Sequence, residues 1–451
     1  MPTATSSACF KPFTDRLELL NRNTVQGTSP PSARTLAEWL AHTERLHEQT
    51  IDMGLTRVAA VRDAMGLHPR FPIFTVAGTN GKGSTCALLA ACLSAAGYRV
   101  GVYSSPHLVR YNERVRIGDA FASDACLCDA FSKVEAARGT QSLTPFEFGT
   151  LAAMQVFVEE ALDAVILEVG LGGRLDAVNI FDAHCAIVTS IAIDHEAYLG
   201  HTREAIGYEK AGVFRAQVPA ICADLDPPIS IASSAHERNA QLMQIGRDFS
   251  CGGSADDWWF SFGDTHYTHL PALKLSGEFQ HRNASAALAA LITLRERLPV
   301  SEEALRQGLQ AARLPGRFQM LSGKPLIILD VAHNPHAATE LAHNLQVLPC
   351  NGKTFAVLGM LRDKDIAGVV AIMNPLVDSW HVAGIEERRG ATLAEMMQAL
   401  SAVRGNKLGY ESALTAFLGV LEAAQPEDRI VVFGSFVTVG QILAHLESLN
   451  A

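Results

Sequence analysis

A glycine-rich stretch with one lysine and two adjacent hydroxyl residues could bind a phosphate group. It runs from Gly78 to Thr85, after an apolar run and before the apolar stretch 86–93. The order strand, glycine-rich turn, helix brings backbone N–H groups and a helix N-terminus to an anion, and Lys82 can neutralise its charge. The strict phosphate-loop pattern is not met, because Val76 replaces its first glycine and Gly83 separates Lys82 from the hydroxyl residues. An ordinary glycine-rich turn is the less favoured alternative, and the stretch alone does not choose among nucleotide enzymes.

Two more candidate residues follow apolar runs. Glu168 lies in the run 164–169, and His195 comes shortly after the run 186–191. Because ligands bind beyond the carboxyl ends of parallel strands, we expect both side chains to converge on the phosphate loop. A buried glutamate needs a charge partner, for which a salt bridge is the alternative to a metal. A lone histidine is more often structural, but the neighbouring Asp194 and the loop position favour a metal role for His195.

The elements that must position these residues follow a repeated strand, loop and helix pattern. Predicted strands occupy residues 73–76, 99–103, 164–169, 186–191, 326–329, 354–358 and 430–433. The pattern restarts after Leu314–Arg317, which we interpret as a linker. We therefore expect an α/β fold with helices on both faces of mainly parallel sheets. The first α/β domain, which carries the phosphate loop, would span residues 1–313, and a second, smaller α/β domain would span 314–451.

Other segments give weaker signals. Residues 36–65 read as helical with an end or turn near Gly54, and 283–298 read as an alanine- and leucine-rich helix. Ser301 is the expected N-cap of another helix. Residues 216–276 are less regular, with short antiparallel strands expected from Cys251 onward.

Length and composition narrow the classes of protein. The chain has 451 residues, 48% of them hydrophobic, which suffices for two domains with substantial cores. Its formal charge of −10 argues against a nucleic-acid partner held by phosphate contacts. Residues 1–13 show no apolar core of a secretory signal, and no apolar run has membrane-spanning length. The nine scattered cysteines indicate reduced thiols and a cytoplasmic location, and Cys126 and Cys128 are poor metal evidence.

Six motifs in a fixed order resemble one family. They are Gly78–Ser84, Tyr103–Arg114, Glu168–Ala177, Glu209–Gly212, Leu314–Arg317 and Asp330–Pro335. In this set the chain closely resembles the dihydrofolate synthase/folylpolyglutamate synthase family, which is related to the muramyl-peptide ligases of the cell wall. The resemblance covers nearly all of the chain. It implies a phosphate-loop ATPase domain at the N-terminus, a smaller Rossmann-like α/β domain at the C-terminus and an active site in the cleft between them.

The implied reaction joins a carboxylate to the amino group of L-glutamate. A carboxylate is a poor electrophile, and ATP overcomes this by forming an acyl phosphate that the amine attacks. The implied substrates are dihydropteroate, folates, L-glutamate and ATP, with two Mg²⁺ sites, in a cytoplasmic monomer. Because three anionic groups must come together, cations and backbone donors are needed. Lys82, Lys210 and His333 are the implied catalytic residues.

The resemblance also assigns ATP and metal contacts. The ATP contacts are Thr79, Asn80, Gly81, Lys82, Gly83, Ser84, Asn283, Arg317 and Asp330. The metal ligands are Ser105, Glu168, His195 and Lys210 as a carbamate. The phosphate-loop rule alone would put Ser84 on the metal, and we follow the resemblance in keeping it as a phosphate contact. A plain surface lysine is the alternative for Lys210.

Two further sets of contacts follow from the same resemblance. Incoming glutamate is assigned to His333 and Ser435. The pteroate contacts are Asp52, Met53, Thr144, Pro145, Phe146, Glu147, Leu175, Asp176 and Ala177. Phe146 offers an apolar face to a flat ring, with core packing an equal alternative, and Asp176 offers a carboxylate to the N–H edge of a pterin.

Three competing functions remain at this point. A muramyl-peptide ligase would carry a separate N-terminal domain for its sugar nucleotide, but only 77 residues precede Gly78 and they read as helical. A phosphate-loop switch or binding module would not need Glu168, His195, Lys210 and a second domain. An enzyme with folylpolyglutamate synthase activity alone is the third. The segments around Asp52 and 144–147 resemble the bacterial bifunctional type.

Overall fold

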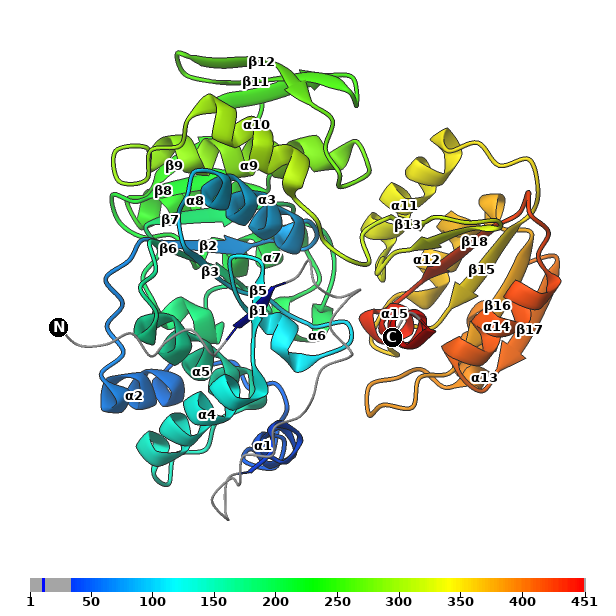
Figure 1. The fold of residues 1–451 in the computed structure, drawn as a ribbon, viewed down its shortest axis with the longest axis horizontal. Coiled ribbons are helices and arrows are strands. Elements are labelled where there is room, and N and C mark those ends of the chain that lie inside the picture. Colours follow the sequence, from blue (N-terminus) through cyan, green and yellow to red (C-terminus); the bar gives the residue numbers. More distant parts are fainter. Residues whose placement is uncertain (1–9, 13–33, 450–451) are drawn as a thin grey trace. The chain divides into compact units, whose positions relative to one another are not determined.

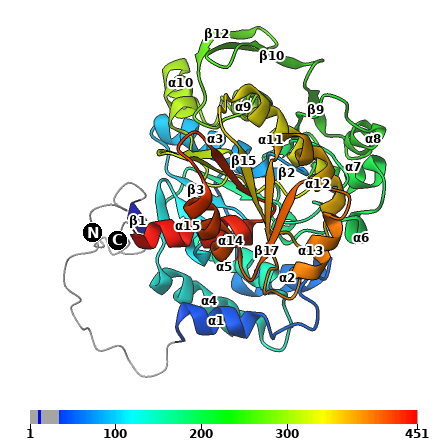
Figure 2. The same cartoon turned by 90° about the vertical axis from the view of Figure 1, so that its right-hand side faces the viewer.

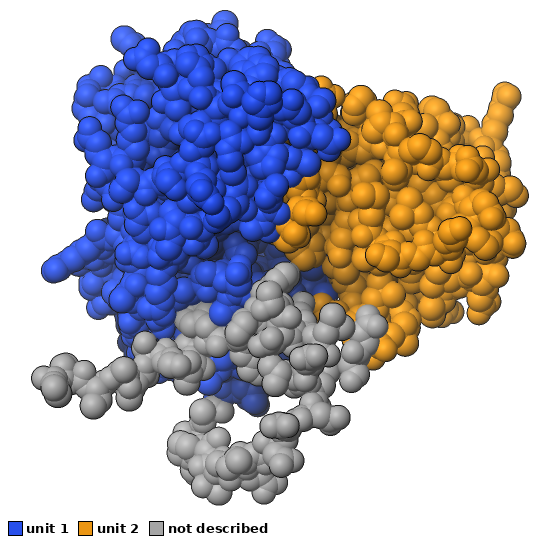
Figure 3. All heavy atoms as spheres, turned by 45° about the horizontal axis from the view of Figure 1, so that its top comes forward, with its two compact units in different colours: residues 1–191, 201–272, 282–312 blue, residues 192–200, 273–281, 313–451 orange. Residues whose placement is uncertain are grey.

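The computed structural model describes residues 10–12 and 34–449 and divides the chain into two compact units (Figure 3). The first unit comprises residues 1–191, 201–272 and 282–312, and the second comprises 192–200, 273–281 and 313–451. The second unit thus includes two short segments, 192–200 and 273–281, that precede the predicted domain boundary after residue 313. Most of the stretch 1–13, in which we found no secretory signal, lies outside the described residues.

A nine-stranded sheet forms the centre of the first unit. Its order is β1-β5-β4-β3-β6-β2-β7-β8-β9. The strands span Phe10–Pro12 (β1), Ile73–Ala77 (β2), Val100–Tyr103 (β3), Val115–Ile117 (β4), Ala120–Ala122 (β5), Ala164–Glu168 (β6), Cys185–Val188 (β7), Pro219–Cys222 (β8) and Gln241–Gln244 (β9). Six neighbouring strands pair in parallel, in the order β3, β6, β2, β7, β8 and β9. Strands β1, β5 and β4 form an antiparallel edge next to β3. Every residue of β2, β6 and β7 is buried, as expected for parallel strands covered on both faces.

Helices cover both faces of this sheet. They span Leu36–Thr43 (α1), Thr56–Met65 (α2), Lys82–Ala95 (α3), Asp124–Arg138 (α4), Pro145–Glu159 (α5), Arg203–Ala211 (α7), Ile229–Glu237 (α8), Phe279–Thr293 (α9) and Glu302–Ala311 (α10). In Figure 1, α3, α9 and α10 lie on one side of the sheet, and α2, α4 and α5 lie on the other. Ser301 caps α10 through a side-chain bond to the amide of Ala304, which confirms the prediction.

The region 216–276 contains more structure than its sequence predicted. The expected antiparallel strands form a separate small sheet of Phe249–Gly253 (β10), Asp257–Phe262 (β11) and Thr265–Pro271 (β12). Strands β8 and β9, which we did not predict, extend the parallel sheet instead. Their four-residue length gives too few residues for a clear apolar period. The helix expected at 283–298 also begins earlier, at Phe279, and ends at Thr293.

A six-stranded sheet forms the centre of the second unit. Its order is β13-β14-β18-β15-β16-β17, parallel except for β13. The strands span Gln319–Leu321 (β13), Leu326–Leu329 (β14), Thr354–Leu358 (β15), Ser379–Ala383 (β16), Asn406–Tyr410 (β17) and Arg429–Phe433 (β18). The helices span Pro335–Val347 (α11), Ile366–Met373 (α12), Leu393–Ala399 (α13), Ala413–Ala423 (α14) and Phe436–Leu449 (α15), and the short α6 spans Glu196–Leu199. Figure 2 shows α11, α12 and α13 on one face of this sheet and α14 and α15 on the other.

The predicted α/β fold class is therefore confirmed for both units. Residues 36–65 form two helices, α1 and α2, separated by an irregular segment at 44–55. This confirms the predicted helix end or turn near Gly54, but the break between the helices is longer than expected. None of the helices within residues 34–449 is long and apolar enough to span a membrane.

Candidate active site

The turn between β2 and α3 has the geometry of an anion-binding loop. Gly81 is the N-cap of α3 and has a φ of 86°, a conformation that favours glycine. A Cβ atom on Gly81 would lie 2.4 Å from Oδ1 of Asn283. The loop can therefore lie this close to α9 only because Gly81 has no side chain. The Lys82 ammonium donates to the carbonyl oxygens of Gly78 at 2.9 Å and Thr79 at 3.1 Å. The lysine therefore lies over its own loop, where it can meet a bound phosphate.

Two hydroxyl residues after β7 hold this loop in place. The carbonyl oxygen of Asn80 accepts hydrogen bonds from Oγ1 of Thr189 at 2.6 Å and Oγ of Ser190 at 3.0 Å. The amide of Asn80 donates to Oγ of Ser190 at 3.1 Å, and the amide of Thr79 donates to the carbonyl oxygen of Ser190 at 2.7 Å. These contacts fix the direction of the loop's amides before any ligand binds. Ser84, expected to contact phosphate, is buried in the first turn of α3.

Glu168 and Ser105 lie together at the carboxyl ends of β6 and β3. Glu168 is buried, and one of its carboxylate oxygens accepts from the amide of Ser105 at 3.4 Å. Burial raises the pKa of the Cys86 thiol well above its usual value, the Glu168 carboxylate raises it further, and Lys82 opposes both effects. The charges of the Glu168 carboxylate and the Lys82 ammonium are therefore both close enough to α3 to affect the pKa of Cys86. A buried carboxylate beside a serine is a hard oxygen donor set of the kind Mg²⁺ prefers.

Lys210 is buried in the last turn of α7, with 4% of its surface exposed. A surface lysine, the alternative considered from the sequence, does not fit this position. The loop after β6 packs closely against the backbone here, because a Cβ atom on Gly173 would lie 2.9 Å from the Lys210 carbonyl oxygen. Arg174 of the same loop pairs with Glu209 at 2.8 Å. The glycines of this motif thus bring the β6 loop against the lysine.

Four of the residues assigned to pteroate, Thr144 to Glu147, form the N-terminus of α5. Thr144 is the N-cap, Pro145 is in the first turn, and Glu147 completes a capping box with Thr144. The Phe146 ring lies against Gly170, where a Cβ atom would be 2.7 Å from Cζ, and 5.8 Å from the Tyr103 ring. Asp52 lies in the irregular segment 44–55.

Asp176 has a structural role that the sequence did not reveal. Its side chain is buried, and its two oxygens accept from the amides of Leu171 at 2.8 Å and Val178 at 3.0 Å. Burial raises the pKa of this carboxyl to about 6, and these amides oppose the rise. Leu175 and Ala177 flank it in the same loop. Asp176 therefore shapes the loop as well as offering a carboxylate.

In the second unit, Asp330 follows β14 and organises the turn around it. Its carboxylate accepts from the amides of Phe318 and Ala332, both at 2.7 Å, and burial raises its pKa. The guanidinium of Arg317 lies over the Phe436 ring at 5.1 Å. Ser435 is buried before α15, and its hydroxyl donates to Oγ1 of Thr438 at 2.8 Å.

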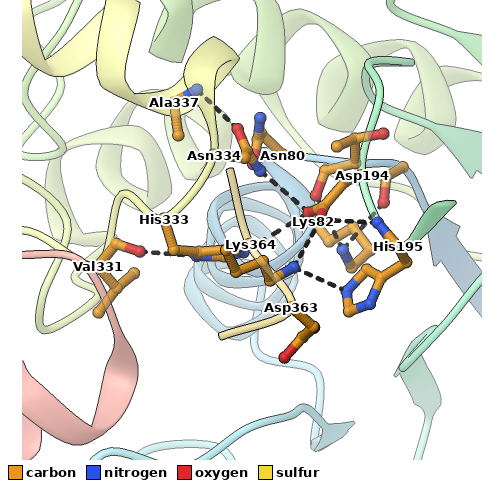
Figure 4. A network of polar contacts seen from close by, with 12 residues as sticks. Asn80, Lys82, Asp194, His195, Val331, His333, Asn334, Ala337, Asp363 and Lys364 are labelled. Carbon is orange, nitrogen blue, oxygen red and sulfur yellow. Dashed lines mark hydrogen bonds and ion pairs between the residues drawn. The ribbon is translucent and has the colours of Figure 1, made fainter. Parts of the chain in front are cut away.

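A polar network within the second unit surrounds Asp194 (Figure 4). Oδ1 of Asp194 accepts from the Lys364 ammonium at 2.6 Å. Oδ2 accepts from the Asn334 side-chain amide at 3.1 Å and lies 3.7 Å from Nε2 of His333. The same ammonium lies 3.2 Å from Nε2 of His195. Because an ammonium only donates, Nε2 of His195 is the accepting nitrogen in this arrangement.

Lys364 is the member of this network that the sequence did not indicate. Its side chain is 4% exposed, and it is 170 residues from Asp194 in the chain. Burial raises the pKa of the Asp194 carboxyl, but contacts with His333, Lys364 and His195 lower it far below its usual range. The network thus contains both His195 and His333, which were candidates for two different roles. Ser105, Glu168 and Lys210 belong to the first unit, so their convergence with His195 stays a prediction.

Two family models match successive parts of the chain. Residues 76–291 match the Mur ligase middle domain, and residues 316–436 match the glutamate ligase domain of Mur ligases. The dihydrofolate synthase/folylpolyglutamate synthase of Escherichia coli is 48% identical over 93% of this chain and 97% of its own length. The chain belongs to the dihydrofolate synthase/folylpolyglutamate synthase family. The enzyme of that name from Haemophilus influenzae is 40% identical over 95% of this chain and all of its own length.

Solved structures of the family agree with this assignment. E. coli FolC in complex with DHPP and ADP has a TM-score of 0.88 at 46% identity, covering 94% of this chain and 100% of that one. A bifunctional folylpolyglutamate synthase/dihydrofolate synthase with Mn, AMPPNP and L-glutamate bound has a TM-score of 0.86 at 48% identity, covering 93% and 100%. Family membership confirms the predicted enzyme class, an ATP-dependent ligase that forms amide bonds.

Proposed function

We propose that this chain joins L-glutamate to dihydropteroate, forming dihydrofolate, and to folyl(poly)glutamates, using ATP. The observation that carries the proposal is the loop at Gly78–Lys82, which is anchored by Ser190 and lies beside the buried carboxylate of Glu168. A helix N-terminus, a lysine and a hard oxygen donor together are suited to binding a nucleoside triphosphate. The family relatives carry the name of this pair of activities.

The chemistry places specific demands on these residues. An oxygen of the substrate carboxylate attacks the γ-phosphorus of ATP, and ADP leaves. The glutamate amine then attacks the acyl carbon, and phosphate leaves with the oxygen that the carboxylate supplied. Lys82 and the amides of Thr79 to Gly83 would stabilise the charge that builds up on the phosphate oxygens. Lys82 can do so by exchanging its bonds to the Gly78 and Thr79 carbonyls for phosphate oxygens.

We infer that divalent metal ions are held by Ser105, Glu168, His195 and a carbamate on Lys210, in two sites. Bound Mg²⁺ would neutralise the phosphates and align them for attack. The chain fits this role through the buried Glu168 carboxylate and the buried Lys210. Residues 10–12 and 34–449 contain no group of three or more histidine, cysteine or acidic side chains that could hold a metal.

We propose that the two predicted domains divide the work. Asn283 from the first, and Arg317 and Asp330 from the second, would complete the ATP site, while His333 and Ser435 would receive glutamate. Coupling ATP contacts to both domains would link domain closure to catalysis. We expect a monomer that acts in the cytoplasm. The eight described cysteines are free thiols, as expected in a reducing compartment.

A glutamate-dependent ADP release assay tests this proposal. The purified enzyme should release ADP with dihydropteroate and with a reduced folate, in each case only when glutamate is present, and mass spectrometry should find the extended products. Activity with the folate alone would establish folylpolyglutamate synthase as the only activity. Activity only with a muramyl sugar nucleotide, or no glutamate-dependent release, would contradict the proposal.

A further inference from the structure

The segment that carries Asp52 has no regular structure of its own, and Arg57 holds it. Arg57 lies in the first turns of α2. Its Nη1 donates to Oδ2 of Asp52 at 2.6 Å, and its Nη2 donates to the Asp52 carbonyl oxygen at 2.9 Å. His47, in the same segment, contacts Oδ2 of Asp52 through Nε2 at 3.0 Å and Ser142 through Nδ1 at 3.0 Å. The side chain and the backbone of Asp52 are therefore both fixed by one guanidinium.

The same guanidinium reaches a second carboxylate. Nη2 of Arg57 donates to Oε1 of Glu147 at 3.2 Å, across 90 residues of sequence. The Glu147 side chain is 4% exposed, and its other oxygen accepts from the Thr144 amide at 2.7 Å. A carboxylate buried to this degree needs a compensating charge, and Arg57 supplies it. One arginine thus joins the irregular segment 44–55 to the first turn of α5.

We propose that Arg57 is a positioning residue for the pteroate pocket. Its guanidinium bonds to the carboxylates of both Asp52 and Glu147 and sets the separation of the two segments that carry them. The inference rests on the proposed function, together with the assignment of Asp52 and Glu147 to pteroate that the family resemblance implies. It goes beyond that function because Arg57 is in none of the sets of contacts assigned above, and its role is to hold residues that would meet the substrate.

The planar guanidinium is essential to this role. It donates from two nitrogens to two carboxylates and one carbonyl oxygen at fixed angles, which an ammonium cannot reproduce. Arg57→Lys should therefore keep the charge but lose the fixed separation of Asp52 and Glu147. Arg57→Met should lose both and leave Glu147 buried without compensation.

Steady-state kinetics of matched variants test the proposal. Arg57→Met should raise the KM for dihydropteroate about tenfold or more, with KM for ATP and for glutamate within about twofold of the wild type. Arg57→Lys should give an intermediate KM. Arg70→Met is the control, since Arg70 is an exposed arginine of the same unit, and it should leave every constant unchanged. A merely structural role would instead lower the melting temperature and the amount of active enzyme, without a selective change in one KM.

A double variant separates positioning from folding. Glu147→Gln keeps an oxygen for the Thr144 amide but removes the buried charge, so Arg57→Met with Glu147→Gln should regain the melting temperature that Arg57→Met alone loses. The raised KM for dihydropteroate should persist in this double variant, because the guanidinium no longer holds Asp52, whose side chain keeps, among the described residues, only its contact with His47. A normal KM for dihydropteroate in the stable double variant would overturn the proposal.

The proposed function can fail separately. A wild type that uses reduced folate but not dihydropteroate would refute the first reaction, and the KM for folate would then be measured in the same variants. There too, a KM that is unchanged in the stable double variant would overturn the role of Arg57.

Discussion

Lys210 is a buried lysine on the α7 helix, and an ammonium at the proposed metal site would repel the metal. A carbamate forms only from the neutral amine, and burial favours that form. If the carbamate supplies a metal ligand, its negative charge is what matters. We therefore expect Lys210→Ala to lose most of the activity and short carboxylic acids to restore part of it. Lys133→Ala, which changes a partly exposed lysine of α4, should behave as the wild type in the same ADP release assay.

Two results would contradict this expectation. Full activity in Lys210→Ala would remove the residue from the site. An intact mass without the added carbon dioxide, measured on active and metal-loaded enzyme under conditions that preserve carbamates, would refute the modification.

Glu168 gives a second prediction for a single residue. Glu168→Gln removes a negative charge from the carboxyl end of β6 while keeping the size of the side chain. If this carboxylate binds the divalent metal, the Mg²⁺ concentration for half-maximal activity should rise steeply, by about tenfold or more, since metal sites of this kind depend on charged oxygen ligands. A superimposable Mg²⁺ titration would exclude Glu168 from the site.

The raised pKa of Asp176 predicts that the free energy of unfolding depends on pH. Burial raises its pKa from 3.8 to about 6 in the folded protein. Because the folded pKa lies above the unfolded one, its contribution to the free energy of unfolding is fully present below about pH 4 and is lost as pH rises through 6. The loss is about 3 kcal/mol. In denaturant titrations, the wild type should lose stability relative to Asp176→Asn over this range. Parallel curves for the two proteins would show that Asp176 does not titrate there.

At the scale of elements, the turn between β2 and α3 depends on the contact of Gly81 with α9. Gly81→Ala would place a Cβ atom 2.4 Å from Asn283, and it should abolish ATP-dependent turnover. Gly97→Ala is a matched control, because Gly97 also has a positive φ, of 88°, but has open space around it. Both variants carry a backbone cost of about 1–2 kcal/mol. Normal turnover in Gly81→Ala would show that the loop does not need this close approach.

The elements themselves were largely predictable, because apolar runs reveal buried parallel strands. The runs at 326–329 and 354–358 match β14 and β15 residue for residue. Contacts between distant segments were not predictable in the same way. Nothing in the local sequence pairs Ser190 with Asn80, or Lys364 with Asp194, since each pair is joined only when the fold brings two loops together. The contact of Arg57 with Glu147 was not predictable for the same reason, because it joins segments 90 residues apart.

At the scale of the whole molecule, the order of six motifs carried more information than any one of them. The phosphate loop alone departs from the strict pattern, but the motifs run through both units and agree with the family match. Segments 192–200 and 273–281 belong to the second unit although the residues on either side of them belong to the first, and this could not be predicted from the sequence. Residues 192–200 follow β7 directly, and they belong to the second unit because Asp194 binds Asn334 and Lys364 there.

The central claim is that ATP activates the substrate carboxylate as an acyl phosphate before glutamate attacks. Oxygen transfer measures this most directly. With dihydropteroate labelled with ¹⁸O in its carboxylate, one labelled oxygen should appear in the released phosphate for each dihydrofolate formed, and the other should remain in the amide. Lys82→Ala should form neither product. Unlabelled phosphate from an otherwise active wild type would contradict the account.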